Sequence, residues 1–100
     1  MTAYKESPDE EQRELALLEA ERLLEIGKIA RADGHHNPAV HNFHQALEIF
    51  EQVRDRSGMG SVLGNLGTTY AVMGRFETAI DCYERALTIA RELGQRVPES

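Results

Sequence analysis

GSVLGNLGTTYAVMGRFETAIDCYERALTIAREL, residues 60–93, predicts two antiparallel helices joined by a short turn. In the first half of this stretch, Gly64, Gly67 and Ala71 recur at spacings of three and four, so they share one helical face. Another backbone can approach such a face closely, because no long side chain stands in the way. Apolar residues recur at similar spacings after the turn at residues 73–75. The stretch therefore predicts a helix-turn-helix unit whose helices pack tightly.

The order of residues resembles the tetratricopeptide repeat, a family whose pattern runs Trp-x2-Leu-Gly-x2-Tyr, then Ala-x3-Phe, then Ala. Leu63 takes the place of the first tryptophan, and Arg91 takes that of a late proline. The resemblance implies a unit that stacks on copies of itself into a superhelix, whose concave face binds partner proteins. It implies no catalytic chemistry. The nine positions that agree in order and spacing are Leu63, Leu66, Gly67, Tyr70, Gly74, Phe76, Ala79, Tyr83 and Ala86.

A second copy of the unit lies forty residues upstream, so the repeat is visible within the chain itself. It is the weaker copy, because Ala30 replaces Tyr70 and His36 stands where Phe76 stands. The forty-residue period resembles the longer-helix variety of these repeats, found in receptor-independent G-protein regulators and bacterial signalling proteins, whose arrays bind peptides or partner domains. The equivalent pairs are Ile26 and Leu66, Gly27 and Gly67, Ala30 and Tyr70, Gly34 and Gly74, Ala39 and Ala79, Val40 and Ile80, Phe43 and Tyr83, Ala46 and Ala86, and Leu47 and Leu87.

We therefore expect an all-α fold of the α-solenoid type, made of two stacked helix-turn-helix repeats with four antiparallel helices. Ser7-Pro8 supplies an N-cap and a first-turn proline for a lengthened first helix, which Gly34 ends. Gly58 and Gly60 are expected to flank the connector before the third helix. The expected helices run from Ser7-Pro8 to about Asp33, then over about 38–54, 59–72 and 76–93. The expected domains are a flexible N-terminus at 1–7, a repeat domain at 8–94 (repeat one about 20–53, repeat two about 60–93) and a polar tail at 95–100.

Length and composition exclude several classes of protein. A chain of 100 residues with 41% apolar side chains suffices for one small domain. A net charge of −6 argues against a nucleic-acid partner. No apolar run approaches the roughly 20 residues of a membrane span, and the first residues lack the apolar core of a signal peptide. The single cysteine, Cys82, permits no internal disulfide, so we expect a cytoplasmic protein without a membrane partner.

The last helix keeps an outward apolar stripe that a following repeat would normally cover. If about 300 Å² of apolar surface is bare, its burial contributes about 7 kcal/mol before the costs of association. We therefore expect a homo-oligomer, most simply a two-fold dimer, or a partner that completes the stack. The first helix carries further apolar residues along its extension, which also need a cover. The expected oligomer surface is Leu15, Leu18, Ile80, Tyr83, Leu87 and Ala90.

A groove for a protein or peptide partner follows from the resemblance. In peptide-binding arrays the position of Asn65 faces the groove, and an asparagine there hydrogen-bonds the ligand's backbone; the equivalent residue in repeat one is Glu25. Lys28 and Arg31 could meet a carboxylate, although the basic set of the chaperone-type carboxylate clamp is not reproduced. The groove positions carried over from the family are Glu21, Leu24, Glu25, Lys28, Arg31, Ser61, Asn65, Thr68 and Val72.

All four histidines, His35, His36, His41 and His44, fall within ten residues. Imidazoles at such spacings could hold a zinc or nickel ion, or respond to pH near 6. They could equally be ordinary polar residues of a turn and an exposed helix face. Because no cysteine or carboxylate completes the set, we expect no metal and no cofactor.

No catalytic constellation is visible. The spelling Gly58-x-Gly60-x3-Gly64 fits a nicotinamide phosphate loop, but such a loop follows a strand, whereas the residues before Gly58 belong to a helix end. Cys82 lies among apolar residues, where a thiol is usually inert. We expect a protein-interaction module that is not an enzyme. The alternatives are a structural oligomerisation unit, a piece of a longer array, or a metal- or pH-responsive adaptor.

Overall fold

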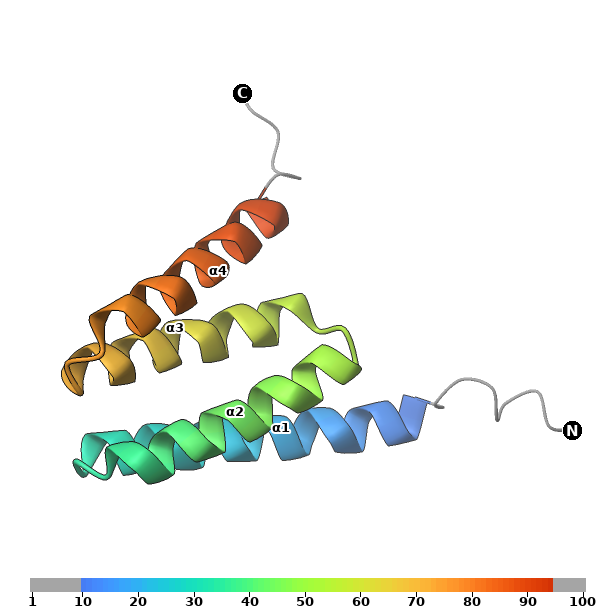
Figure 1. Ribbon diagram of the computed structural model, residues 1–100. Coiled ribbons are helices and arrows are strands. Elements are labelled where there is room, and N and C mark those ends of the chain that lie inside the picture. Colours follow the sequence, from blue (N-terminus) through green and yellow to red (C-terminus); the bar gives the residue numbers. More distant parts are fainter. Residues whose placement is uncertain (1–9, 95–100) are drawn as a thin grey trace, which may run out of the picture.

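The structure is a computed structural model, and it describes residues 10–94 as four antiparallel α-helices. Figure 1 shows them following one another through space in chain order, with each helix running opposite to the previous one. Each helix packs against the next, and α1 also touches α3. The described residues contain no strand, so the predicted all-α architecture is confirmed. The helices are α1 (Glu10–Ala32), α2 (His36–Gln52), α3 (Arg56–Val72) and α4 (Phe76–Gly94).

All three turns between the helices have the same backbone conformation. Each contains one residue with a left-handed φ, at Gly34 (84°), Arg54 (61°) and Gly74 (83°), spaced by twenty residues. The amide of this residue donates to the carbonyl three residues earlier, and the next amide donates to the carbonyl five residues earlier. This pair of bonds is the Schellman motif, which satisfies the last carbonyls of a helix. The same turn therefore follows each of the first three helices, and Arg54 is the one of these three left-handed positions that is not a glycine.

The third helix begins earlier than the sequence indicated. Asp55 is its N-cap, and the Asp55 carboxylate accepts a hydrogen bond of 3.1 Å from the amide of Gly58. Gly58 and Gly60 therefore lie inside α3, and the prediction that they flank the connector was wrong. A Cβ atom at Gly58 would stand 2.4 Å from the ring of Phe50 on α2, so this glycine serves close helix packing. The second helix likewise ends at Gln52, because Arg54 has left the helical conformation.

The core lies between consecutive helices and repeats its contacts forty residues apart. The ring of Phe43 covers Gly27, where a Cβ atom would stand 2.6 Å from it. The ring of Tyr83 covers Gly67 in the same way, at 2.7 Å. These matched contacts show that the two repeats are equivalent in three dimensions. The most deeply buried side chains are Ala20, Ala39, Phe43, Ala46, Phe50, Val62, Leu63, Leu66, Thr69 and Ala79.

The extension of α1 is attached to the rest of the fold. The guanidinium of Arg13 donates a 2.6 Å hydrogen bond to the carbonyl of Val53 in the turn between α2 and α3.

The predicted Ser7-Pro8 cap, the N-terminus at 1–7 and the tail at 95–100 lie outside the described residues. None of the described helices is long and apolar enough to cross a membrane.

Candidate functional site

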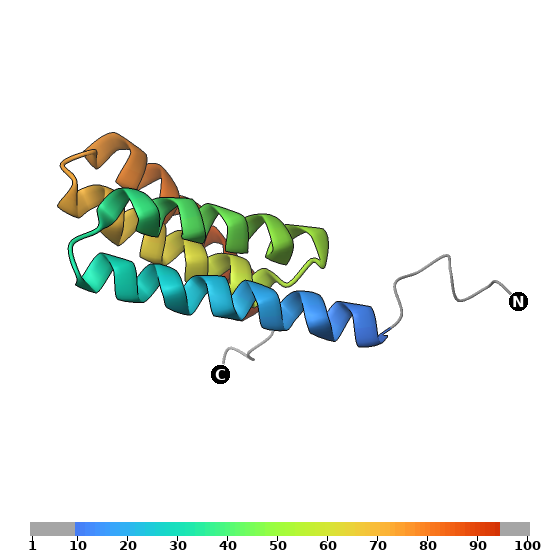
Figure 2. The same ribbon diagram turned by 90° about the horizontal axis from the view of Figure 1, so that it is seen from below.

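The predicted groove lies along α1 and α3, which run in the same direction and touch each other (Figure 1). On each helix the predicted residues, apart from the adjacent pair Leu24 and Glu25, are three or four positions apart, so they form one stripe per helix. One contact joins the two stripes: Nη1 of Arg31 donates a 2.8 Å hydrogen bond to Oδ1 of Asn65. Figure 2 shows the same helices from below, with α1 along the lower edge. The Arg31–Asn65 bond therefore joins the last groove position of α1 to α3 and links the two repeats.

Both ends of the Asn65 amide are engaged within the protein. Its oxygen accepts from Arg31, and its nitrogen donates to the carbonyl of Ser61 at 2.9 Å. A ligand backbone must therefore compete with these bonds or use the groups around them. This engagement could not be read from the sequence, since it depends on a contact between residues 34 positions apart.

The two cations of the groove differ in their partners. Nζ of Lys28 lies 3.1 Å from Oε2 of Glu25, one turn earlier on α1, so its charge is largely compensated. Arg31 is half-buried, and among residues 10–94 it makes no ion pair; its one hydrogen bond goes to a neutral amide. A guanidinium carries five N–H donors, so most of those on Arg31 are available to an incoming carboxylate.

The remaining groove positions divide into accessible and occupied ones. Glu21 and Ser61 are exposed, and Val72 is exposed near the end of α3. The Thr68 hydroxyl is bonded to the carbonyl of Gly64 and lies 2.8 Å from the hydroxyl of Tyr83. Leu24 belongs to the buried core, so its assignment to the groove was wrong. The spacing alone could not separate Leu24 from Glu25, because adjacent positions border the same helical stripe.

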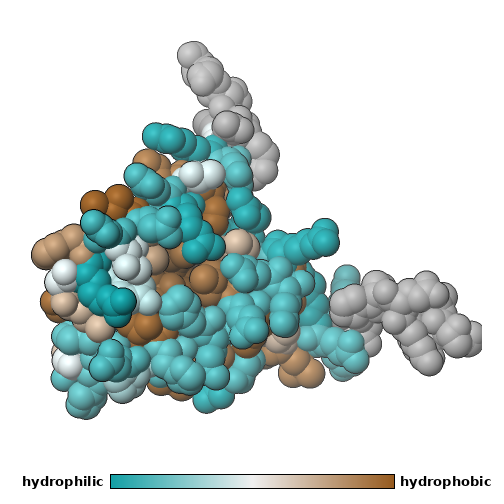
Figure 3. Space-filling view, viewed as in Figure 1, coloured by the Kyte–Doolittle hydropathy of each residue, from teal (hydrophilic) through white to brown (hydrophobic). Residues whose placement is uncertain are grey.

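Apolar side chains remain exposed at the two ends of the stack. Of the ten large apolar residues that are exposed in the described part of the chain, all except Val72 lie on α1 or α4. Figure 3 shows apolar surface on the side of α4 and its turn, and a smaller area along α1. All six residues of the expected oligomer surface are exposed, but the sequence reasoning missed Ile26, Ile29 and Phe76 on the same stripes. We define the α1 face as Leu15, Leu18, Ile26 and Ile29, and the α4 face as Phe76, Ile80, Tyr83, Leu87 and Ala90.

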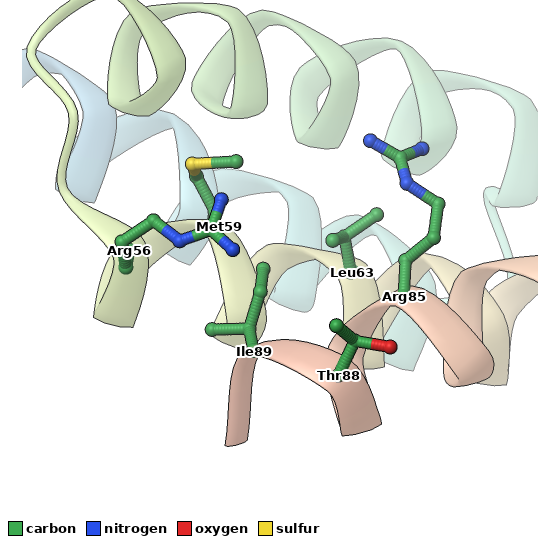
Figure 4. A pocket seen from close by; sticks show the side chains of 6 residues that line it. All are labelled: Arg56, Met59, Leu63, Arg85, Thr88 and Ile89. Carbon is green, nitrogen blue, oxygen red and sulfur yellow. The ribbon is translucent and has the colours of Figure 1, made fainter. Parts of the chain in front are cut away.

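A hollow of about 200 Å³ opens between the first half of α3 and the second half of α4 (Figure 4). Met59, Leu63 and Ile89 give it an apolar floor, and Arg56 and Arg85 stand at its sides. Both cations already have carboxylate partners, since Arg56 pairs with Glu92, and Arg85 lies 3.8 Å from Glu51. The hollow therefore offers no uncompensated charge to a ligand.

The four histidines lie in the turn after α1 and on α2. Within residues 10–94, no group of three His, Cys, Asp or Glu side chains is placed to hold a metal ion. Nε2 of His44 lies 3.1 Å from the hydroxyl of Tyr70 on α3, so His44 takes part in the contact between repeats. Nδ1 of His36 is buried and has no hydrogen-bond partner among the described residues. The described residues therefore bring no three of the four rings together as metal ligands.

Cys82 is buried in the described part of the chain. Burial raises the pKa of the Cys82 thiol, and the nearby Asp81 carboxylate adds to this effect. The thiol is therefore kept protonated and unreactive. The Thr69 hydroxyl is buried and donates to the carbonyl of Asn65 at 2.8 Å. Burial also raises the pKa of Tyr70, which packs beneath the guanidinium of Arg75.

Stacked helix pairs that repeat every forty residues define a helical-repeat protein of the α-solenoid class. The sequence model described as Tetratricopeptide repeat matches residues 19–92. The chain therefore belongs to the tetratricopeptide repeat family, as the residue pattern indicated. Over 74 residues it is 32% identical to Photosystem I assembly protein Ycf3 of Rippkaea orientalis (strain PCC 8801 / RF-1), a match that covers 74% of this chain and 39% of that protein. The chain thus spans about two fifths of the length of this relative, and no solved structure matches it significantly.

Proposed function

We propose that this protein is a non-enzymatic interaction module that binds a peptide or helix of a partner protein along α1 and α3. The observation that carries the proposal is the Arg31–Asn65 bridge, which holds a half-buried cation in the groove without a carboxylate partner among residues 10–94. Such a cation favours a partner that presents an acidic side chain or a free C-terminal carboxylate.

The comparison with a named relative supports a role in assembly. That relative is described as an assembly protein of photosystem I, so its name refers to the building of a protein complex. We propose the corresponding general role for this chain, which is to hold a partner protein while a complex is built. The single, buried Cys82 fits a reducing compartment, and we propose the cytoplasm as the site of action.

The groove is tested with an array of random peptides, each made once with a free C-terminal carboxylate and once as the amide. We expect a subset of carboxylate peptides to bind, and Arg31→Ala to weaken their binding about tenfold or more, since a charge-assisted bond in a partly desolvated site is lost. Arg31→Lys should restore part of the affinity because it keeps the charge.

The matched control is Arg85→Ala, which removes an arginine of α4 that already faces Glu51 of α2. The affinity of this variant for the carboxylate peptides should equal that of the wild type. A bound peptide should slow hydrogen exchange at the amides of α1 and α3. Equal binding by wild type and Arg31→Ala, or protection confined to α4, would overturn the proposed groove.

We also propose that the protein self-associates, with a homodimer as the smallest assembly. The specific observation is the concentration of exposed apolar side chains on α1 and α4. Sedimentation over a hundredfold concentration range should show a mass that rises from one chain to at least two. A constant monomer mass at high micromolar concentration would overturn self-association without affecting the groove.

A further inference from the structure

The α4 face is the structural equivalent of the α2 face that α3 covers. Phe43 is 0% exposed, whereas its equivalent Tyr83 is 43% exposed, although each ring packs on a glycine in the same way. Leu47 is 7% exposed, and its equivalent Leu87 is 49% exposed. The difference arises because α2 has a following helix in the described chain and α4 has none. The α4 face is therefore an uncovered copy of an interface that the protein already forms.

The α1 face stands in the same relation to α3. Leu66 and Thr69 of α3 are 0% exposed because they lie in the interior next to α2, whereas their equivalents Ile26 and Ile29 are 37% and 62% exposed. Where α3 has the buried Thr69, α1 has Ile29, whose side chain is larger and fully apolar. Such a side chain suits a covered position better than a solvated one. The two ends of the molecule thus carry the two halves of one missing contact.

The residue sizes at the two halves are complementary. In the α2–α3 contact, the large Phe50 packs on the small Gly58. The equivalent residues are Ala90 on α4 and Leu18 on α1, so the large and the small partner exchange sides. A helix pair that keeps the sum of its side-chain volumes can keep the same spacing between its axes.

We propose that copies of this chain stack head to tail, with α1 of one copy packed on α4 of the next in the geometry of α2 and α3. The inference rests on the proposed self-association and specifies its interface. A two-fold dimer would pair two identical faces, whereas this contact pairs two different ones and leaves a free face at each end. It also aligns the α1 and α3 grooves of successive copies into one longer groove.

One residue limits the strength of the contact. Arg22 occupies the position of the fully buried Val62, and it is paired with Glu19 on the same helix at 2.9 Å. Covering this ion pair removes water from both charges, which offsets part of the apolar gain. We therefore expect a weaker contact than the one between α2 and α3, with dissociation in the micromolar range or above.

The decisive experiment blocks one face at a time with Leu18→Glu and Leu87→Glu, and then mixes the two variants. Both side chains are exposed, so circular dichroism and thermal melting should show both variants folded. Alone, each variant should be a monomer by sedimentation, because each lacks one of the two faces that every contact needs. The mixture should form a heterodimer and nothing larger, through α4 of Leu18→Glu and α1 of Leu87→Glu.

Other outcomes identify the step that fails. If the wild type associates but one single variant still dimerises, or the mixture stays monomeric, the interface is not head to tail and this inference is wrong. If the wild type never associates, the proposed self-association fails with it. Gln45→Glu adds the same charge at an exposed site of α2, outside both faces and the groove, and should associate like the wild type.

Arg22→Val offers an independent gain of function. It copies the α3 residue at this position, and we expect self-association to tighten about tenfold or more, because no charged group is then buried. The gain should vanish when Leu87→Glu is added. Unchanged association of Arg22→Val would show that the α1 face is not covered in the assembly, which would contradict the head-to-tail contact.

Discussion

Arg54 is the residue whose backbone conformation fits its side chain least well. Its φ of 61° matches the left-handed position that glycine occupies at Gly34 and Gly74. A left-handed conformation costs an L-residue about 1–2 kcal/mol, while glycine loses more chain entropy on folding. We expect Arg54→Gly to stabilise the protein by about 0.5–1 kcal/mol, measured as a higher urea midpoint with an unchanged slope.

The reverse exchange supplies the matched control for this prediction. Gly34→Arg and Gly74→Arg place a side chain in the same left-handed conformation, and an added Cβ atom meets nothing within 4 Å at either site. Their loss of stability should therefore report conformation and not a clash, and should be similar in size to the gain at Arg54. Arg54→Gly without any gain would show that the arginine side chain compensates for its backbone.

The raised pKa of Cys82 makes stability depend on pH in one direction. Burial favours the protonated thiol in the folded state, so the unfolded chain releases this proton at a lower pH than the folded chain does. The resulting stability is present below the unfolded pKa of about 8.5 and is lost as the pH rises through the folded pKa. We expect the difference in unfolding free energy between wild type and Cys82→Ala to shrink between about pH 8 and pH 10.

Urea titrations at a series of pH values test this. Tyr70, whose pKa is also raised, is present in both proteins, so the part of its pKa shift that comes from burial cancels in the difference, whereas the smaller part that comes from Cys82 does not. A difference that stays constant to pH 10 would show that the thiol is not protected by burial.

At the scale of the helix pair, the ring-on-glycine contact has a different tolerance in each repeat. A Cβ atom at Gly27 would stand 2.6 Å from the Phe43 ring, which is fully buried and cannot move aside. At Gly67 the obstructing ring belongs to Tyr83, which is partly exposed and can swing outward. We expect Gly27→Ala to destabilise the protein by about 2 kcal/mol, and Gly67→Ala by clearly less, because alanine's better helix propensity offsets a smaller clash.

Thermal unfolding of the two variants side by side measures the contrast. Equal losses would mean that Tyr83 is held as firmly as Phe43, for instance by its hydroxyl contact with Thr68.

Hydrophobic periodicity predicted the four helices well, because each helix buries a stripe of residues at helical spacing. The two turns that contain glycine were also recognisable from their sequence. It failed at the start of α3, where Asp55 caps the helix and Gly58 fits beneath Phe50. Glycine in the first turn resembles a connector in sequence, and only the neighbouring ring shows why it belongs to the helix. The groove was predicted by position in the repeat. The pairing of Arg31 with Asn65 and the burial of Leu24 depend on how the two repeats pack, and the pattern of a single helix does not determine that packing.

At the scale of the whole molecule, protection from solvent is uneven. The molecule is extended, measuring 53 × 40 × 19 Å, and only α2 and α3 have neighbours on both sides within the described chain. We expect amide hydrogens of α2 and α3 to exchange slowest, and those in the first turns of α1 and the last turns of α4 to exchange fastest. Mass spectrometry of peptides after timed exchange measures this, at a concentration below that of self-association. Uniform protection across all four helices would contradict the prediction.

The three identical turns also bear on how the chain reaches its fold. Their hydrogen bonds span no more than five residues, and each helix packs mainly on the one that follows it, so forming the structure requires no long loop to close. Folding rates rise as contacts become more local in sequence. A nucleus can therefore arise in either helical hairpin and spread to the other. We therefore do not expect slow folding limited by topology, because each helix can pack on its neighbour in turn.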